Sequence, residues 1–216
     1  MDRVAVARRS GFLYNRVQKN ANSSVIIFVH WLETGCMRGD IRSRKSVPHL
    51  GDWPVRHMAE LPEMPRMVVV RDPFSRTLSA FLNKVNSPRF RADVGQLGAT
   101  PDGFSRFIRW LDSGGMGVNP HWDLQTKQLI LPLDHYTDVI RFERLEKELA
   151  SFFERLGIDA DHMHSSGAFK RGRAHRTEAN DLLHQFYDAD GAQIVRRLFE
   201  TDFQVLGYDP SWTPGE

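Results

Sequence analysis

The sequence predicts an α/β fold, in which one domain spanning residues 1–216 holds a doubly wound parallel sheet flanked by helices. Short apolar runs rich in β-branched residues alternate along the chain with longer amphipathic segments at helical spacing. Capping and turn residues stand between them, and no internal repeat or low-complexity linker interrupts this order. With 41% hydrophobic and 26% charged residues, the 216-residue chain suits a single globular core.

The first two elements lie on either side of a polar run. The segment GFLYNRV (11–17) predicts a strand, and the run QKNANSS closes it. A helix is expected to follow as far as Leu32, with Ser23 or Ser24 as its N-cap and Gly35 as its C-terminal stop. The β-branched residues of this segment would equally suit a strand, so both interpretations stay open here.

The middle of the chain contains the clearest element boundary. Residues 36–65 carry four prolines and are expected to be irregular, with a short helix near 54–61. RMVVV (66–70) predicts a buried strand. Asp72 then fits the N-cap of a helix and Pro73 its first position, where the missing N–H costs nothing.

The remaining elements follow from apolar spacing. Leu78, Phe81, Leu82 and Val85 give the helix after Asp72 a core-facing stripe. The later part of the chain predicts helices over 104–112, 123–131 and 143–157, a strand over 138–142, and two closing helices within 177–208.

Composition and charge exclude several classes of function. The net charge of +2 comes without a continuous basic stripe, so nucleic acid is not an expected partner. The longest purely apolar run, Val25–Val29, is far shorter than the roughly 20 residues that span a bilayer. Cys36 is the single cysteine, and the N-terminus has no apolar block of signal-peptide length. We therefore expect a cytoplasmic protein without disulfides or a transmembrane segment.

Two strand-to-helix turns carry anion-binding side chains. Lys19, Ser23 and Ser24 follow the first predicted strand, and Arg71 and Ser79 follow the second. Ligands of parallel sheets bind beyond the carboxyl ends of the strands, where helix N-termini present unpaired N–H groups. Singly, these residues also fit a solvated lysine, helix-capping serines and a local ion pair. Together they favour a ligand with two separated anionic groups.

Four segments resemble those of sulfotransferases that use 3'-phosphoadenosine 5'-phosphosulfate (PAPS). KNANSS (19–24) resembles their 5'-phosphosulfate loop, and VVVRDPFSRTLSAF (68–81) is similar to their 3'-phosphate segment. HWDLQ (121–125) resembles the His-Trp-x-Pro-Gln stretch of the carbohydrate branch, with Leu124 in place of the proline. The segment LFETDFQVLGY is similar to the final helix of that branch. The resemblance covers nearly the whole chain and implies the P-loop-NTPase-like fold of these enzymes.

The resemblance implies a role for each matching residue. Lys19 would contact the bridging and 5'-phosphate oxygens, whereas Arg71 and Ser79 would hold the 3'-phosphate. The 5' cradle would be completed by Asn20, Ala21, Asn22, Ser23 and Ser24. Lys170 and Arg171 either add contacts to the 3'-phosphate or belong to a solvated basic loop. No metal ion is implied.

Sulfuryl transfer also needs a general base with a pKa near 7, which favours histidine. His49 stands 22 residues before Arg71 (71 − 49), where a histidine is the base in the uronyl 2-O-sulfotransferase branch that the chain resembles. His121 opens the HWDLQ stretch and is the second candidate for the base. His57, Glu33 and another carboxylate remain open alternatives.

These residues together predict a PAPS-dependent O-sulfotransferase. PAPS would be the co-substrate, and the acceptor would be a hydroxyl of a carbohydrate or of another hydroxylated metabolite, sulfated by in-line displacement. Two alternatives stay open, a nucleotide-dependent kinase of related fold and a non-catalytic domain that binds 3'-phosphoadenosine nucleotides. Against the kinase, the chain has no G-x-x-x-x-G-K-[ST] loop, and Lys19 precedes the polar run instead of ending it.

Overall fold

The computed structural model describes residues 3–36, 47–52, 55–166, 168–169 and 179–214. The chain divides into two compact units. One, here called the sheet unit, comprises Met1–Val70 and Gln128–His175, and the other, the helical unit, comprises Arg71–Lys127 and Arg176–Glu216. The assignment of the whole chain to one domain stays a prediction.

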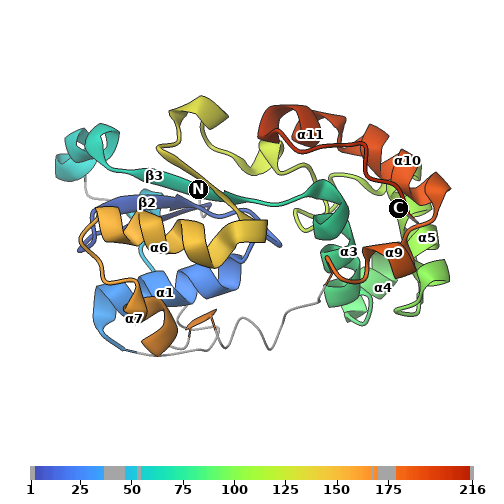
Figure 1. Cartoon of the computed structure of the whole chain (residues 1–216), viewed down its shortest axis with the longest axis horizontal. Coiled ribbons are helices and arrows are strands. Elements are labelled where there is room, and N and C mark those ends of the chain that lie inside the picture. The colour runs from blue at the N-terminus through green and yellow to red at the C-terminus, as the bar shows by residue number, and fades with distance from the viewer. Residues whose placement is uncertain (1–2, 37–46, 53–54, 167, 170–178, 215–216) are drawn as a thin grey trace. The chain divides into compact units, whose positions relative to one another are not determined.

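The sheet unit contains a four-stranded, mostly parallel sheet, which confirms the predicted α/β fold (Figure 1). Its strands are β1 (Val4–Ala7), β2 (Phe12–Asn15), β3 (Arg66–Val70) and β4 (Asp138–Arg141), in this order across the sheet. β2, β3 and β4 are parallel, and β1 pairs antiparallel with β2 at one edge. The carboxyl ends of the three parallel strands therefore lie at the same end of the sheet.

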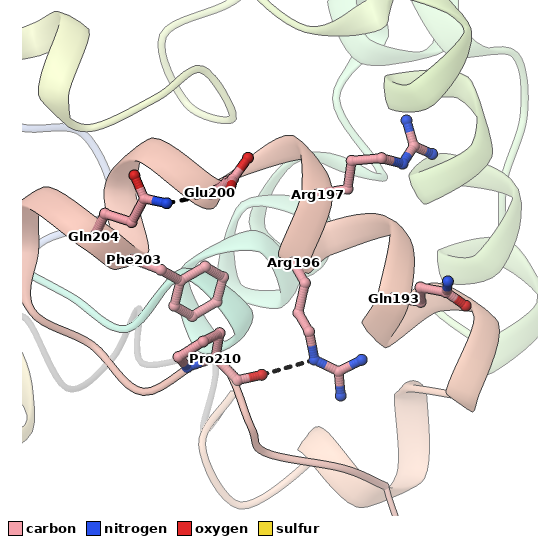
Figure 2. A pocket seen from close by; sticks show the side chains of 7 residues that line it. All are labelled: Gln193, Arg196, Arg197, Glu200, Phe203, Gln204 and Pro210. Carbon is pink, nitrogen blue, oxygen red and sulfur yellow. Dashed lines mark hydrogen bonds between the residues drawn. The ribbon is translucent and has the colours of Figure 1, made fainter.

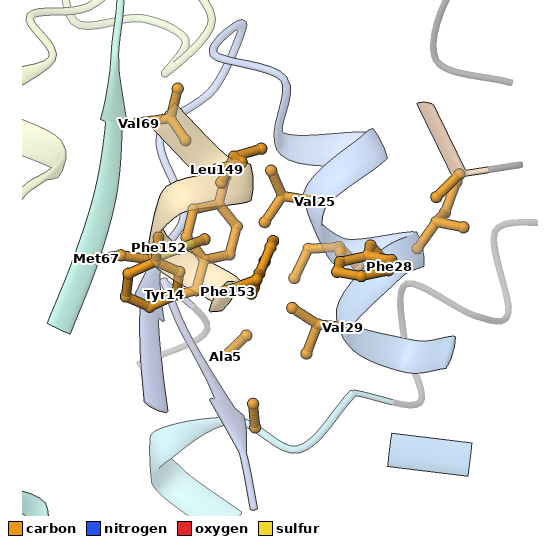
Figure 3. Close-up of a cluster of buried hydrophobic side chains, with 14 of the residues drawn as sticks. Ala5, Tyr14, Val25, Phe28, Val29, Met67, Val69, Leu149, Phe152 and Phe153 are labelled. Atoms are coloured by element: carbon orange, nitrogen blue, oxygen red, sulfur yellow. The ribbon is translucent and has the colours of Figure 1, made fainter. Parts of the chain in front are cut away.

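Alternation along the strands decides which side chains meet the helices. Ala5, Tyr14, Met67 and Val69 point toward α1 (Asn22–Thr34) and α6 (Leu145–Arg155), which cover one face of the sheet (Figures 1 and 3). Phe28 of α1 and Phe153 of α6 pack edge to face, with ring centroids 4.9 Å apart. The other face has its own smaller apolar cluster of Val4, Val6, Leu13 and Met64.

β1 was not predicted. Its four residues, VAVA, form a short apolar run. All four are buried, although an arginine stands on each side of the run in the sequence. Its outer edge is covered by the chain near His49, which forms a β-bridge with Ala5. Val6 N donates to Pro48 O at 2.9 Å beside that bridge.

The other elements of the sheet unit are short. The helix expected near 54–61 is the 3₁₀-helix η2 (Val55–Glu63), and β3 has the predicted bounds. The predicted helix over 143–157 is α6, preceded by η6 (Phe142–Arg144). Further short helices of this unit are η1 (Leu50–Asp52), η5 (Leu133–His135) and α7 (Asp161–Ser165).

Three helices of the helical unit begin in the same way. α3 (Pro73–Lys84), α4 (Pro88–Val94) and α5 (Pro101–Trp110) each have proline in the first position after an N-cap of Asp72, Ser87 or Thr100, and each cap side chain accepts a backbone N–H. This confirms the predicted start of the helix after Asp72. A π-helical segment, η3 (Leu111–Gly115), follows α5.

The part of the closing segment that the structure describes, residues 179–208, forms three helices instead of the two predicted. They are α9 (Leu183–Phe186), α10 (Ala189–Leu198) and α11 (Glu200–Leu206). Phe74, Phe81, Phe107 and Trp122 belong to the aromatic core of this unit.

Two other predictions are wrong. The helix over 123–131 is absent except for the 3₁₀ turn η4 (Thr126–Gln128), because side chains take the backbone N–H groups that a helix would use. Asp202 accepts those of residues 125 and 126, and Asn15 accepts that of Ile130. The N-cap of α1 is Ala21, not Ser23 or Ser24, whereas Gly35 ends the helix as predicted.

Candidate anion-binding site

The turn between β2 and α1 has an unusual backbone. Lys19 (φ 72°) and Ala21 (φ 54°) are both left-handed, a conformation that residues with a Cβ seldom adopt and that costs free energy at each position. Such residues accumulate at ligand-binding turns, where the surrounding structure holds the strain. Left-handed residues in a turn also direct successive amides into a concavity that suits an anion.

The start of α1 offers a positive helix end with no acidic neighbour. Its N-cap, Ala21, has only a methyl side chain, and the first turn contains no Asp or Glu. The macrodipole and the first N–H groups of this 13-residue helix therefore face whatever lies beyond its N-terminus. Lys19 is half-buried in the same turn, and Arg16 Nε donates to Asn22 Oδ1 at 3.2 Å. The turn and the start of α1, residues 16–24, are here called the first cradle. It thus combines two cations with a helix N-terminus.

Two side chains hold this turn in place within the sheet unit. Asn20 is fully buried, and its Nδ2 donates to Val69 O of β3 at 2.8 Å. Gln128 Oε1 accepts the Gln18 N–H at 3.1 Å, and Gln128 O accepts Asn15 Nδ2 at 3.0 Å. The side chain of Asn20 therefore serves to fix the loop, which explains an asparagine at this position.

Arg71 stands at the start of the helical unit and is 4% exposed. Its Nε donates to Ser75 Oγ at 3.1 Å, and its Nη2 donates to Asn180 Oδ1 at 3.2 Å. Ser79 lies one turn beyond Ser75 on the same face of α3 and is buried. The guanidinium is therefore directed along a face that carries two hydroxyls.

The N-terminus of α3 differs from that of α1. Asp72 caps it, and its Oδ1 accepts the Ser75 N–H at 2.8 Å. A carboxylate already occupies the positive end of this helix, which leaves the guanidinium of Arg71 as the candidate anion-binding group here.

Arg76 follows Ser75 in α3. Its guanidinium is buried and donates to Asp123 O at 2.8 Å and to Pro120 O at 3.2 Å. Burial lowers the pKa of Arg76 to about 10, an effect that the nearby carboxylates of Asp202 and Asp123 oppose. Arg76 thus organises the loop that carries His121.

His121 is half-buried on that loop and is oriented by Asn119. Its Nδ1 lies 2.6 Å from Asn119 Oδ1, which also accepts the His121 backbone N–H at 3.1 Å. An amide oxygen only accepts, so this contact requires the proton on Nδ1 and leaves Nε2 as the basic nitrogen of the neutral ring.

His49 is held mainly through its backbone. Its N–H donates to Asp52 Oδ2 at 3.1 Å, and its β-bridge to Ala5 places it beside β1 in the sheet unit. The ring Nδ1 is enclosed and has no hydrogen-bond partner among the residues that the structure describes. A buried polar atom of this kind needs a partner, and a bound ligand is one source of it.

Glu33 and His57 are the other two candidates named for the base. Glu33 lies in the last turn of α1, about 16 Å along the helix from Asn22, and its carboxylate accepts the Arg9 N–H. His57 falls in η2, where the structure does not describe its side chain, and Lys170 and Arg171 lie outside the described residues.

A separate hollow of about 420 Å³ lies on α10 and α11 (Figure 2). Its two arginines are already engaged, because Arg196 donates to Pro210 O and Trp212 O, and Arg197 binds Asp112. The lining residues are Gln193, Arg196, Arg197, Glu200, Phe203, Gln204 and Pro210, and none of them was predicted for the site.

Several residues that support the two cradles were missed from the sequence. These are Arg16, Ser75 and Gln128, whose hydrogen bonds cannot be predicted from a local sequence pattern. Gln125 belongs to the HWDLQ stretch noted in the sequence, but its hydrogen bonds to the Arg71 backbone were not predicted.

Across the described part of the chain, no cluster of three or more His, Cys, Asp or Glu side chains could bind a metal ion. In the same residues, no helix has the length and apolarity that crossing a membrane requires.

Comparison with known proteins gives a match at the level of the family. The model of the family described as "Sulfotransferase family" matches residues 2–209. No curated protein and no solved structure matches the chain.

Proposed function

Because this chain belongs to the sulfotransferase family, we propose that it transfers the sulfuryl group of PAPS to a hydroxyl of its acceptor. The acceptor in this proposal is a carbohydrate or another hydroxylated metabolite. The observation that carries the proposal is the first cradle, a turn with left-handed Lys19 and Ala21 that leads into a helix without an acidic first turn.

The 5'-phosphosulfate is assigned to this first cradle. Lys19 contacts the bridging and 5'-phosphate oxygens, and the N–H groups at the start of α1 bind the rest of the anion. Arg16 and Asn22 support this assignment, since their contact brings a second cation to the turn. Ser23 and Ser24 lie in the first turn of α1, which suits their proposed part in the cradle.

The 3'-phosphate is assigned to Arg71 and Ser79, with Lys170 and Arg171 as additional contacts. The direction of the Arg71 side chain along the Ser75 face of α3 supports its part in this assignment. A guanidinium binds a phosphate through paired hydrogen bonds, which suits a group that must be told apart from a plain hydroxyl.

Catalysis in this proposal is a single in-line displacement. The acceptor oxygen forms a bond to sulfur while the bond between sulfur and the bridging phosphate oxygen breaks, and the acceptor proton passes to a histidine. Lys19 and the α1 N-terminus stabilise the charge that develops on the leaving phosphate, so the chain itself supplies the cations. His49 is the proposed base, and His121 is the alternative.

The test is a comparison of nucleotides by isothermal titration calorimetry. We expect 3'-phosphoadenosine 5'-phosphate to bind without Mg²⁺ and at least tenfold more tightly than ATP with Mg²⁺, because each of its two anionic groups has its own proposed cradle. Tighter binding of ATP with Mg²⁺ would instead support the kinase alternative. Tight binding of the 3'-phosphate nucleotide without any turnover of PAPS across a panel of glycans, phenols and other alcohols would support a binding domain.

A further inference from the structure

The side chain of Gln125 forms two hydrogen bonds with the backbone of one residue, Arg71. Oε1 accepts the Arg71 N–H at 3.0 Å, and Nε2 donates to Arg71 O at 2.7 Å. Gln125 is fully buried. β3 pairs with β4 only as far as Val70, so Arg71 is the first residue beyond the ladder, and the amide of Gln125 replaces the missing strand partner.

Gln125 is itself fixed by a second buried group. Its backbone N–H donates to Asp202 Oδ2 at 2.8 Å, and Thr126 donates to Asp202 Oδ1 from its N–H at 3.0 Å and from its hydroxyl at 2.8 Å. Asp202 of α11 is 0% exposed, and three donors satisfy its carboxylate. A continuous set of hydrogen bonds therefore runs from Asp202 through Gln125 to the backbone of Arg71.

We propose that Gln125 and Asp202 are positioning residues for the 3'-phosphate, acting through the backbone of Arg71. This inference rests on the proposed function and extends it to two residues that bind no part of the nucleotide. The guanidinium of Arg71 reaches its ligand from a backbone that Gln125 holds on both polar groups, so the position of the Arg71 Cα follows the position of the amide. A shift of the Cα moves the guanidinium away from a phosphate whose distance is fixed by the rest of the nucleotide.

The experiment measures dissociation constants for 3'-phosphoadenosine 5'-phosphate and for AMP, which lacks the 3'-phosphate. Gln125→Glu keeps an acceptor for the Arg71 N–H but opposes the Arg71 carbonyl with a second oxygen. We expect about tenfold weaker binding of the 3'-phosphate nucleotide and less than a twofold change for AMP. Arg71→Ala in the same assay gives the full value of the 3'-phosphate contact.

Gln128→Leu is the matched control, because this nearby glutamine bonds to the Gln18 backbone of the first cradle. It is expected to weaken both nucleotides to a similar extent, since both carry a 5'-phosphate. Asp202→Asn, which retains one acceptor oxygen as an amide carbonyl, repeats the comparison if Gln125→Glu melts below the assay temperature.

The two proposals fail in different ways. Equal losses for both nucleotides in the Gln125 and Asp202 variants would overturn the positioning role and leave only a structural one. An unaltered protein that does not prefer the 3'-phosphate nucleotide over AMP would instead overturn the proposed function.

Discussion

At the scale of single residues, the two candidate bases differ in what surrounds their rings. Asn119 fixes the ring of His121 with the proton on Nδ1, whereas the enclosed Nδ1 of His49 has no partner among the described residues. A base needs one ring nitrogen directed at the acceptor hydroxyl, and the other nitrogen decides the tautomer. Each histidine therefore meets part of the requirement, and they differ in a measurable way.

We expect His49→Ala to lower the rate of sulfuryl transfer by about 100- to 10,000-fold, the usual value of general base catalysis. Nucleotide affinity should remain within twofold, because this side chain is not part of either cradle. His121→Ala is the comparison variant and should lose less than tenfold. The measurement is transfer of labelled sulfate from PAPS to an acceptor found in the panel. The reverse order of losses would assign the base to His121, and Asn119→Ala should then also slow transfer.

At the scale of elements, the helices α1 and α3 begin in opposite ways. α3 supplies its own carboxylate through Asp72, whereas α1 begins at an alanine after a strained turn. A helix that lacks a polar cap gives up stability that Ser, Thr or Asp would provide. Without a ligand, the first cradle is therefore less stable than the same helix start would be with a polar N-cap. Ligand-binding sites often give up stability in this way.

Asn22→Asp tests this trade directly. The change keeps the shape and the Arg16 contact, and it adds a negative charge in the first turn of α1. We expect the free energy of unfolding to rise by about 0.3–1 kcal/mol through the helix dipole. The affinity for 3'-phosphoadenosine 5'-phosphate should fall at least tenfold, because the new carboxylate repels the 5'-phosphate.

Asn83→Asp is the control, since it adds the same charge at an exposed position in the last turn of α3. It should alter nucleotide affinity by less than twofold. If Asn22→Asp binds the nucleotide as tightly as the unaltered protein, the first cradle is not an anion site.

Local chemistry decided which elements were predictable. β3 and the start of α3 have the predicted bounds because an apolar run, an N-cap and a proline specify them without help from distant residues. The left-handed turn before α1 leaves no mark in its residue types, because glycine is the usual signal for it. The helix predicted over 123–131 does not form because Asp202 and Asn15, which lie far away in sequence, accept N–H groups of this segment.

The candidate site shows the same division. Lys19 and Arg71 could be proposed from the sequence because each follows a predicted strand, and Ser79 because it lies in the helix after the second strand. The residues that hold them, such as Gln125 and Gln128, make their contacts across 54 and 110 positions of the chain. Contacts of that range are settled only by tertiary packing.

At the scale of the whole molecule, buried phenols link ionisation to stability. Burial raises the pKa of Tyr14, Tyr136 and Tyr187 above the ordinary value for a phenol, and the carboxylate of Asp72 adds to the effect at Tyr187. A raised pKa in the folded state contributes stability below about pH 10, the value for the unfolded chain. That stability is lost as the pH rises above 10, because only the unfolded chain then releases these protons.

We therefore expect three of the four tyrosines to ionise together with unfolding in an alkaline titration. Absorbance of tyrosinate near 295 nm should rise for at most one residue while circular dichroism remains native, and the rest should follow the loss of helical signal. Tyr14→Phe should remove part of the delayed rise without lowering stability, since the Tyr14 hydroxyl has no hydrogen-bond partner among the described residues. Ionisation of all four phenols in the native state would contradict this prediction.

The pairing of Gln125 with Arg71 also has an evolutionary meaning. The chain leaves this point at Arg71 and returns to it 54 positions later, after α3, α4 and α5, so the whole excursion starts and ends at one pair of hydrogen bonds. The entropic contribution to the free energy of closing such a loop rises by only about 0.6 kcal/mol for each doubling of its length. Insertions and deletions within the excursion can therefore accumulate while its closure point stays unchanged. In a lineage of such proteins, changes in the length of this stretch would leave the backbone of Arg71 in its place.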